Sequence, residues 1–301
     1  MKLRSSLPFF PVALVLFVTP LQAQQTLPAS TQVFLSTLAH LERLSRSDFM
    51  EISSKAQAGE PEAQYLLALI YDEGMLVPED HVTGLAWMLK SAEQGYTPAE
   101  DGMGEMYLQN FWGDGPVRQY ADADRWLRLA ARDGNAEAQF RLGHGYRRGW
   151  FGAIDYGEAI NWLKKAAAQG LPDAESCLGQ MYELREGVPE SPALAASWYR
   201  KAADHFPEIG GMPVGGVWEA EGQLAYMYRD GRLKGNDVEA YMWFAVVDSS
   251  LDPPVDPATD DAVKQVAKRM TKAEIAEAQQ RTKDWINRHP TLSQLPPLLN
   301  R

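Results

Sequence analysis

Apolar and small residues recur with a period of about 36 residues between roughly residue 59 and residue 250. In the first half of each period, an alanine is followed eight residues later by a tyrosine. These pairs are Ala63/Tyr71, Ala99/Tyr107, Ala138/Tyr146, Ala174/Tyr182 and Ala220/Tyr228. In the second half, a small residue is followed three residues later by a tryptophan: Gly84/Trp87, Ala123/Trp126, Ala159/Trp162, Ala195/Trp198 and Ala240/Trp243. Such spacings keep residues near one helix face, so the pattern predicts stacked helix pairs that bury their apolar faces only against neighbours.

A further small residue stands five positions after each repeat alanine: Ala68, Gly104, Gly143, Gly179 and Ala225. Glycine inside a helix costs about 1 kcal/mol relative to alanine. Three glycines at one position therefore predict that two helices approach closely there. The repeated tryptophans are predicted to lie in the core rather than to form a ligand stack.

The pattern A-x-x-x-[LM]-[GA]-x-x-Y, followed by A-x-x-W-x-x-x-[AS]-A-x-x-G, resembles the Sel1-like repeat, a relative of the tetratricopeptide repeat. Five copies cover about 59–94, 95–133, 134–169, 170–205 and 216–250. The resemblance implies an all-α protein, a right-handed α-solenoid of antiparallel helix pairs with a concave surface. It also implies an adaptor, regulator or assembly factor rather than an enzyme.

Helical caps are expected at both ends of the repeats. Residues 24–58 are predicted to hold an N-terminal linker and a cap helix, and residues 251–301 a C-terminal helical cap and tail. Thr271 and Glu274 form a capping-box pattern that predicts the start of a final helix running to about Asn287.

The first residues predict export. Lys2 and Arg4 precede an apolar run that ends near Val18, shorter than the roughly 20 apolar residues that span a bilayer. Residues 1–23 are therefore predicted to be a cleaved secretory signal, with an uncleaved membrane anchor as the alternative. Many bacterial members of the resembling family work at the cell envelope, so we expect a periplasmic or secreted protein without membrane insertion after cleavage.

Charge and cysteine content narrow the possible partners. The formal net charge of −11 disfavours non-specific binding to nucleic acid or to an anionic membrane surface. Cys177 is the single cysteine, so no intramolecular disulfide can form. With no base expected beside it, Cys177 is predicted to be partly buried and inert.

No pattern in the chain predicts catalysis, a metal or a cofactor. The sequence lacks His-Glu-x-x-His and Gly-x-Ser-x-Gly, and its histidines are scattered over different repeats. The glycine-rich stretch 210–216 lacks the strand before it and the Lys-Ser/Thr after it that a phosphate loop needs. It is predicted to be a flexible loop between repeats.

Candidate binding residues come from positions that the repeat does not use for packing. Three, six, nine and ten residues after Ala138, the third repeat carries a basic cluster with an aromatic neighbour: Arg141, His144, Arg147, Arg148 and Trp150. We expect these side chains on an exposed face, where they can anchor an acidic peptide or a carboxylate ligand. The alternative is that Arg141 and Arg148 only pair with Glu105, Glu175 or Glu183 on adjoining helices.

Two insertions interrupt the period. Three extra residues in the second repeat accompany Phe111 and Trp112, which are predicted either to form an exposed docking patch or to fold back over the loop's own base. Ten extra residues lie between the fourth and fifth repeats.

The sequence therefore predicts a non-enzymatic scaffold or regulator in the periplasm or cell envelope. It would bind a peptide or partner protein on the concave face made mainly by the first helices of the repeats. The alternative is a protein or enzyme that acts on cell-wall or carbohydrate material.

Overall fold

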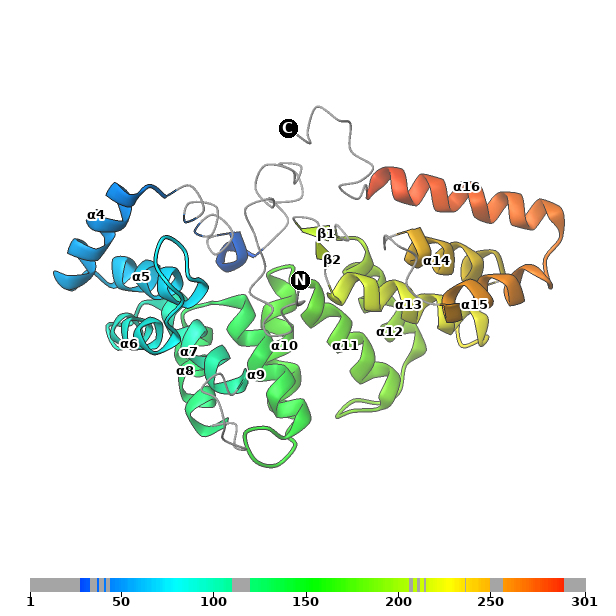
Figure 1. Cartoon of the computed structure of the whole chain (residues 1–301). Helices are drawn as coiled ribbons and strands as arrows, with labels where there is room; N and C mark the ends of the chain where they lie inside the picture. The colour runs from blue at the N-terminus through cyan, green and yellow to red at the C-terminus, as the bar shows by residue number, and fades with distance from the viewer. Residues whose placement is uncertain are drawn as a thin grey trace. The chain divides into compact units, whose positions relative to one another are not determined.

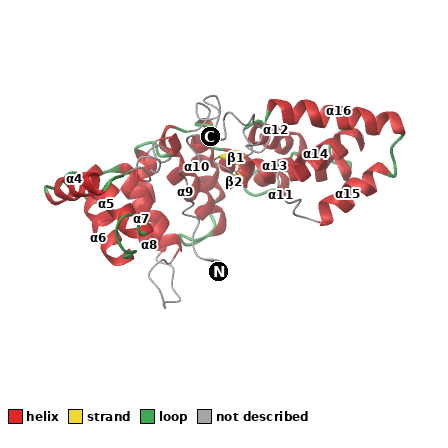
Figure 2. Ribbon diagram, turned by 45° about the horizontal axis from the view of Figure 1, so that its top comes forward, coloured by secondary structure: helices red, strands yellow, loops and turns green. Residues whose placement is uncertain are grey.

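The computed structural model describes residues 28–32, 37, 41, 44–109, 120–205, 208–209, 212–213, 215–235, 237–249 and 257–289. Their regular structure is almost entirely helical (Figures 1 and 2). The chain divides into two compact units, one containing Ala29–Leu142 and the other Gly143–Arg301. Within the described part of the chain, no helix combines the length and apolar character needed to cross a membrane.

The first unit consists of successive helices that pack on one another. They are α4 (Arg46–Gln57), α5 (Pro61–Glu73), α6 (His81–Ala92), α7 (Thr97–Gln109), α8 (Tyr120–Arg132) and the first half of α9 (Ala136–Arg148). Helix α4 contacts α5, α5 pairs with α6, and α7 pairs with α8. Pro61 stands at the first position of α5, where the missing N–H of proline has no effect.

The second unit continues the same arrangement. After the end of α9 come α10 (Tyr156–Ala168), α11 (Pro172–Leu184), α12 (Pro192–Ala203), β1 (Glu208–Ile209), β2 (Met212–Pro213), α13 (Gly215–Arg229), α14 (Asp237–Ser249), α15 (Pro257–Ala267) and α16 (Lys272–Arg288). Helix α11 pairs with α12 and α13 with α14, and the last helix, α16, packs on α14. The predicted all-α solenoid of helix pairs with helical caps is confirmed. The capping box of Thr271 and Glu274 is present at the start of α16.

The glycines of the repeat allow close helix contact, as predicted. A Cβ atom added to Gly104 would lie 2.5 Å from the Leu127 side chain, and one added to Gly179 would lie 2.6 Å from the Tyr199 ring. Both distances are far shorter than normal carbon–carbon contacts, so even one methyl group does not fit.

The core position of the second helices is the residue after each tryptophan. Met88, Leu127, Leu163, Tyr199 and Phe244 are all at most 2% exposed. The tryptophans themselves lie at the edge of the core: Trp126, Trp162 and Trp243 are buried, but the prediction of a core position is wrong for Trp87 and Trp198, which are half-buried. Each of these two indole rings makes a cation–π contact with a lysine: Lys90 Nζ lies 4.1 Å from the Trp87 ring centre, and Lys201 Nζ lies 5.4 Å from that of Trp198.

The insertion before the fifth repeat contains regular structure where a flexible loop was predicted. Strands β1 and β2 pair antiparallel, with Ile209 opposite Met212. Gly215 and Gly216 already belong to the first turn of α13. A Cβ atom on Gly216 would lie 2.4 Å from the backbone of Pro172 and Asp173, so glycine lets the first turns of α13 and α11 touch.

Candidate functional site

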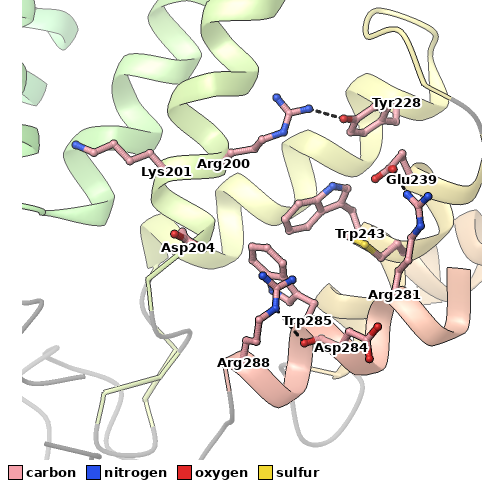
Figure 3. A pocket seen from close by; sticks show the side chains of 11 residues that line it. Arg200, Lys201, Asp204, Tyr228, Glu239, Trp243, Arg281, Asp284, Trp285 and Arg288 are labelled. Atoms are coloured by element: carbon pink, nitrogen blue, oxygen red, sulfur yellow. Dashed lines mark hydrogen bonds and ion pairs between the residues drawn. The ribbon is translucent and has the colours of Figure 1, made fainter. Parts of the chain in front are cut away.

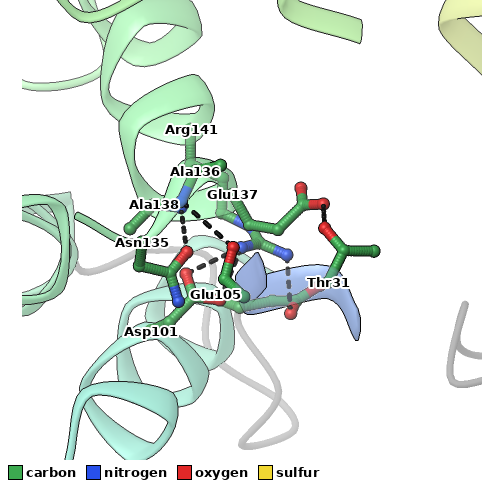
Figure 4. A network of polar contacts seen from close by, with 9 residues as sticks. Thr31, Asp101, Glu105, Asn135, Ala136, Glu137, Ala138 and Arg141 are labelled. Atoms are coloured by element: carbon green, nitrogen blue, oxygen red, sulfur yellow. Dashed lines mark hydrogen bonds and ion pairs between the residues drawn. The ribbon is translucent and has the colours of Figure 1, made fainter. Parts of the chain in front are cut away.

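Arg141, the first residue of the predicted basic cluster, is engaged within the first unit (Figure 4). Its Nη1 donates to both carboxylate oxygens of Asp101, at 2.7 and 2.9 Å, and its Nη2 donates to Glu105 at 3.0 Å. Burial raises the pKa of Asp101 to about 6, although the charge of Arg141 opposes this. The pairing of Arg141 with Glu105, the alternative from the sequence, is thus observed.

A segment from the start of the chain contacts the same helix. Ser30 Oγ accepts a hydrogen bond from the backbone N–H of Ala136 at 3.2 Å, and Thr31 Oγ1 donates to Glu137 at 3.1 Å (Figure 4). Ser30 thus satisfies a backbone donor at the first turn of α9. In the first unit, Ser30 and Thr31 therefore already contact this part of the face that the first helices of the repeats form.

Arg147 was predicted to be exposed, and this prediction is wrong. The residue is 6% exposed and lies in the second unit. Its Nε donates to Glu186 at 2.5 Å, and its Nη1 donates to Gln180 Oε1 at 2.6 Å and to Cys177 Sγ at 3.3 Å. Burial removes water from the guanidinium, and these acceptors offset the cost of that lost hydration. Arg147 therefore holds α9 to residues of α11 and to Glu186, which follows the end of α11.

Of the other basic residues in the cluster, Arg148 is charged at neutral pH and His144 is not. Burial, and then the charges of Arg148 and Arg147, lower the pKa of His144 to about 4, so its imidazole is neutral. His144 packs edge-on against Trp150 with ring centres 4.9 Å apart, and Arg148 Nε lies 3.5 Å from His144 Nε2. Arg148 is exposed. A binding role for these residues stays a prediction.

Phe111 and Trp112 lie outside the described residues. Cys177 is buried, as expected for an inert thiol, and burial raises its pKa against the lowering effect of Arg147. Among the residues that the structure describes, no three His, Cys, Asp or Glu side chains come together in a way that could hold a metal ion.

A polar residue is buried directly after each repeat alanine, a feature that the sequence pattern did not single out. Gln64, Glu100, Gln139, Glu175 and Glu221 are all at most 5% exposed. Gln64 and Gln139 donate to the backbone carbonyls of Ala56 and Ala131, eight residues earlier in each case, at 3.2 and 3.0 Å. These amides satisfy carbonyls at the end of the preceding helix.

The corresponding glutamates of the last two repeats hold other partners. Glu175 is fully buried, forms an ion pair with Lys201 at 2.7 Å, and lies 3.0 Å from His205 Nε2. Glu221 accepts a hydrogen bond from the side chain of Trp285 on α16, while its Oε2 has no partner. Burial raises the pKa of Glu221 to about 8, so this carboxyl group is mostly protonated at neutral pH.

A groove of about 550 Å³ lies in the second unit, between α12, α13, α14 and α16 (Figure 3). Its lining residues are Arg200, Lys201, Asp204, Tyr228, Glu239, Met242, Trp243, Arg281, Asp284, Trp285 and Arg288. Trp243 and Trp285 meet there, with ring centres 4.7 Å apart at an angle of 66°. The groove thus combines an aromatic wall with a mixed set of charged side chains.

Two of the four cations that line the groove have carboxylate partners. Lys201 is paired with Glu175, and Arg281 bonds both Glu239 and Glu277. The pairing leaves these two side chains little positive charge for a ligand.

The other two cations make no ion pair with the described residues. Arg200 donates from Nη2 to the hydroxyl of Tyr228, and its guanidinium lies 5.8 Å from the centre of that ring. Arg288 lies 5.2 Å above the ring of Trp285, and its Nε donates to the backbone carbonyl of Asp284 at 3.2 Å. Both guanidinium groups are held in place by aromatic rings and keep most of their N–H donors.

Two of the three acidic residues of the groove, Glu239 and Asp284, have donors within the described part of the chain. Asp204 lies 3.4 Å from His289 Nε2, and Asp284 accepts a hydrogen bond from Gln280 at 2.9 Å. Glu239 is paired with Arg281. The groove therefore offers unused donors on arginine. The sequence pattern did not reveal it, because Arg281, Trp285 and Arg288 come from a cap helix that has no place in the repeat.

The comparisons with known proteins concern the repeats. The profile of the Sel1 repeat matches residues 61–96, 99–135, 136–171, 172–205 and 218–245. A Sel1 repeat protein from Oxalobacter formigenes is similar at 28% sequence identity and a TM-score of 0.57, over 67% of this chain and 78% of that one. No curated protein matches the chain.

A second similar structure is c5321, a protective antigen of uropathogenic Escherichia coli strains that displays an SLR fold. It is 23% identical with a TM-score of 0.48, and the similarity covers 79% of this chain. This chain spans 56% of the length of that protein.

Proposed function

Because the chain belongs to the Sel1 repeat family, whose members are generally protein–protein interaction scaffolds, we propose that it binds a partner protein in the groove of the second unit. The Sel1 solenoid is typically non-catalytic. The protein therefore acts by holding its partner, as a scaffold or regulator.

One observation carries the choice of the groove. Arg200 and Arg288 line it without a carboxylate partner among the described residues, beside the contact between Trp243 and Trp285. Arginine and aromatic side chains that lie together supply much of the binding energy in protein interfaces. In contrast, Arg141 is occupied by carboxylates of its own chain. The first-helix face is therefore the weaker candidate.

The cell envelope is the proposed place of action. Lys2 and Arg4 before the apolar run support export, and the net charge of −11 supports a soluble protein with little affinity for nucleic acid. Its partner is then an envelope or secreted protein.

Site-specific photo-cross-linking tests this proposal. A photoreactive amino acid replaces Asp204, whose side chain is 71% exposed at the groove, in the full chain expressed in cells. The matched control carries it at Arg132, an exposed position at the end of α8 in the first unit. We expect one discrete protein adduct from position 204, identified by mass spectrometry, and none from position 132.

Adducts of equal yield and identity from both positions would contradict the groove as the binding site. Retention of cell-wall saccharides by the purified chain, with no protein adduct at position 204, would favour the carbohydrate alternative. Replacement of both Arg200 and Arg288 by glutamine should remove the adduct at position 204.

A further inference from the structure

Arg200 and Arg288 line the groove without a carboxylate partner among the described residues. Of the three carboxylates that line it, Glu239 is paired with Arg281 and Asp284 accepts a hydrogen bond from Gln280, whereas Asp204 is 71% exposed. Among the described residues, the guanidinium of Arg200 makes one hydrogen bond, to Tyr228, and that of Arg288 makes one, to the Asp284 carbonyl. Because a guanidinium has five N–H donors, both arginines can still bind acceptor atoms of a ligand in the groove.

Both arginines are prepared for a planar anionic acceptor. The ring of Tyr228 lies beside one guanidinium and that of Trp285 beneath the other, and each guanidinium makes an additional hydrogen bond. An arginine already held on an aromatic ring loses less conformational freedom on binding than a free one. Its remaining N–H groups match the two oxygens of a carboxylate in a bidentate contact.

The two guanidinium groups lie on different sides of the groove. Arg200 extends from α12 toward Tyr228, whereas Arg288 extends from the end of α16, and the rings of Trp243 and Trp285 lie between them (Figure 3). A ligand that uses both needs two carboxylates with an apolar group between them to cover the aromatic wall.

We propose that the groove binds an acidic peptide segment of the partner, with two carboxylate side chains on Arg200 and Arg288 and an apolar side chain between them on Trp243 and Trp285. This inference rests on the proposed partner-binding role of the same groove. The net charge of the chain repels acidic peptides at long range, so recognition depends on these two local contacts.

Fluorescence anisotropy with defined probes tests the inference on the full chain. The probes are labelled, end-blocked octapeptides in which two glutamates flank a leucine at separations of two, three or four residues. Matched probes carry glutamine in place of both glutamates. We expect at least one glutamate probe to bind, its glutamine counterpart to bind at least tenfold more weakly, and added salt to reduce this difference.

Variants locate the contact. The double variant Arg200→Gln and Arg288→Gln should lose the preference for glutamate, whereas Arg132→Gln, which removes one exposed arginine elsewhere, should keep it. Arg200→Lys should bind with intermediate affinity, since lysine keeps the charge but not the fork of donors. Circular dichroism of every variant confirms that the chain stays folded.

Three results would overturn the inference: no binding of any glutamate probe, equal binding of both probe sets, or a preference that persists in the double variant. Binding of anionic lipid vesicles through the same two arginines, without peptide binding, would also overturn it. Each of these results with the adduct at position 204 intact refutes the acidic peptide and leaves the partner-binding role standing. If the chain with both arginines intact forms no specific adduct at position 204, the partner-binding role itself is refuted.

Discussion

Replacement of Gly179 by alanine tests the close helix contact within the repeats. The added methyl group would lie 2.6 and 2.7 Å from two carbons of the Tyr199 ring, which is fully buried. The ring cannot move away easily, since the Tyr199 hydroxyl donates to Glu183 at 2.6 Å. Overpacking of this kind costs about 1–3 kcal/mol. The higher helix propensity of alanine returns about 1 kcal/mol, so the expected net loss of stability is about 1 kcal/mol.

Gly222 is the matched control. It also lies inside a helix, α13, but a Cβ atom there meets no atom within 4 Å. Gly222→Ala should therefore stabilise the chain by about 1 kcal/mol.

Urea unfolding, followed by circular dichroism and by tryptophan fluorescence, measures both variants. The two free energies of unfolding should differ by about 2 kcal/mol, with changes of opposite sign relative to the original chain. If Gly179→Ala stabilised the protein as much as Gly222→Ala, the assigned contact between α11 and α12 would be refuted.

Three further predictions concern buried groups. The pKa of Glu221 is about 4.3 in the unfolded chain but about 8 in the folded one, so the free energy of unfolding should fall by about 3 kcal/mol from pH 5 to pH 7.5. Glu221→Gln should remove this part of the pH dependence, as measured by urea unfolding at each pH. An unchanged dependence on pH in the variant would contradict the prediction. Arg147→Met should cost about 2 kcal/mol, but clearly less in a Glu186→Gln background; equal losses would refute the pairing. Cys177 should react with a thiol reagent only on unfolding, and fast labelling of the folded chain would show that the thiol is accessible.

The repeat register could be predicted from the sequence because one small residue must recur wherever two helices touch. Gly104 and Gly179 could be assigned to packing for this reason, and the structure confirms both contacts. The burial of each tryptophan could not be predicted equally well. Trp198 and the following residue, Tyr199, are separated by about 100° on the helix, and the core lies under Tyr199.

The charged positions depended on contacts that no register describes. Arg147 lies on the same helix as the exposed Arg148, and its burial follows from Gln180 and Glu186, more than thirty residues further along the chain. The groove depends on where α16 docks, because Arg288 and Trp285 reach it from outside the repeats. Sequence patterns of the repeats do not contain this information.

Amide hydrogen exchange of the chain, with and without its cross-linked partner, tests the central claim most directly. If the groove holds the partner, exchange should slow in α12, α14 and α16, around Arg200, Trp243 and Arg288, and stay unchanged in α5 and α7. Slower exchange confined to the first helices of the repeats, with α16 unaffected, would contradict the account.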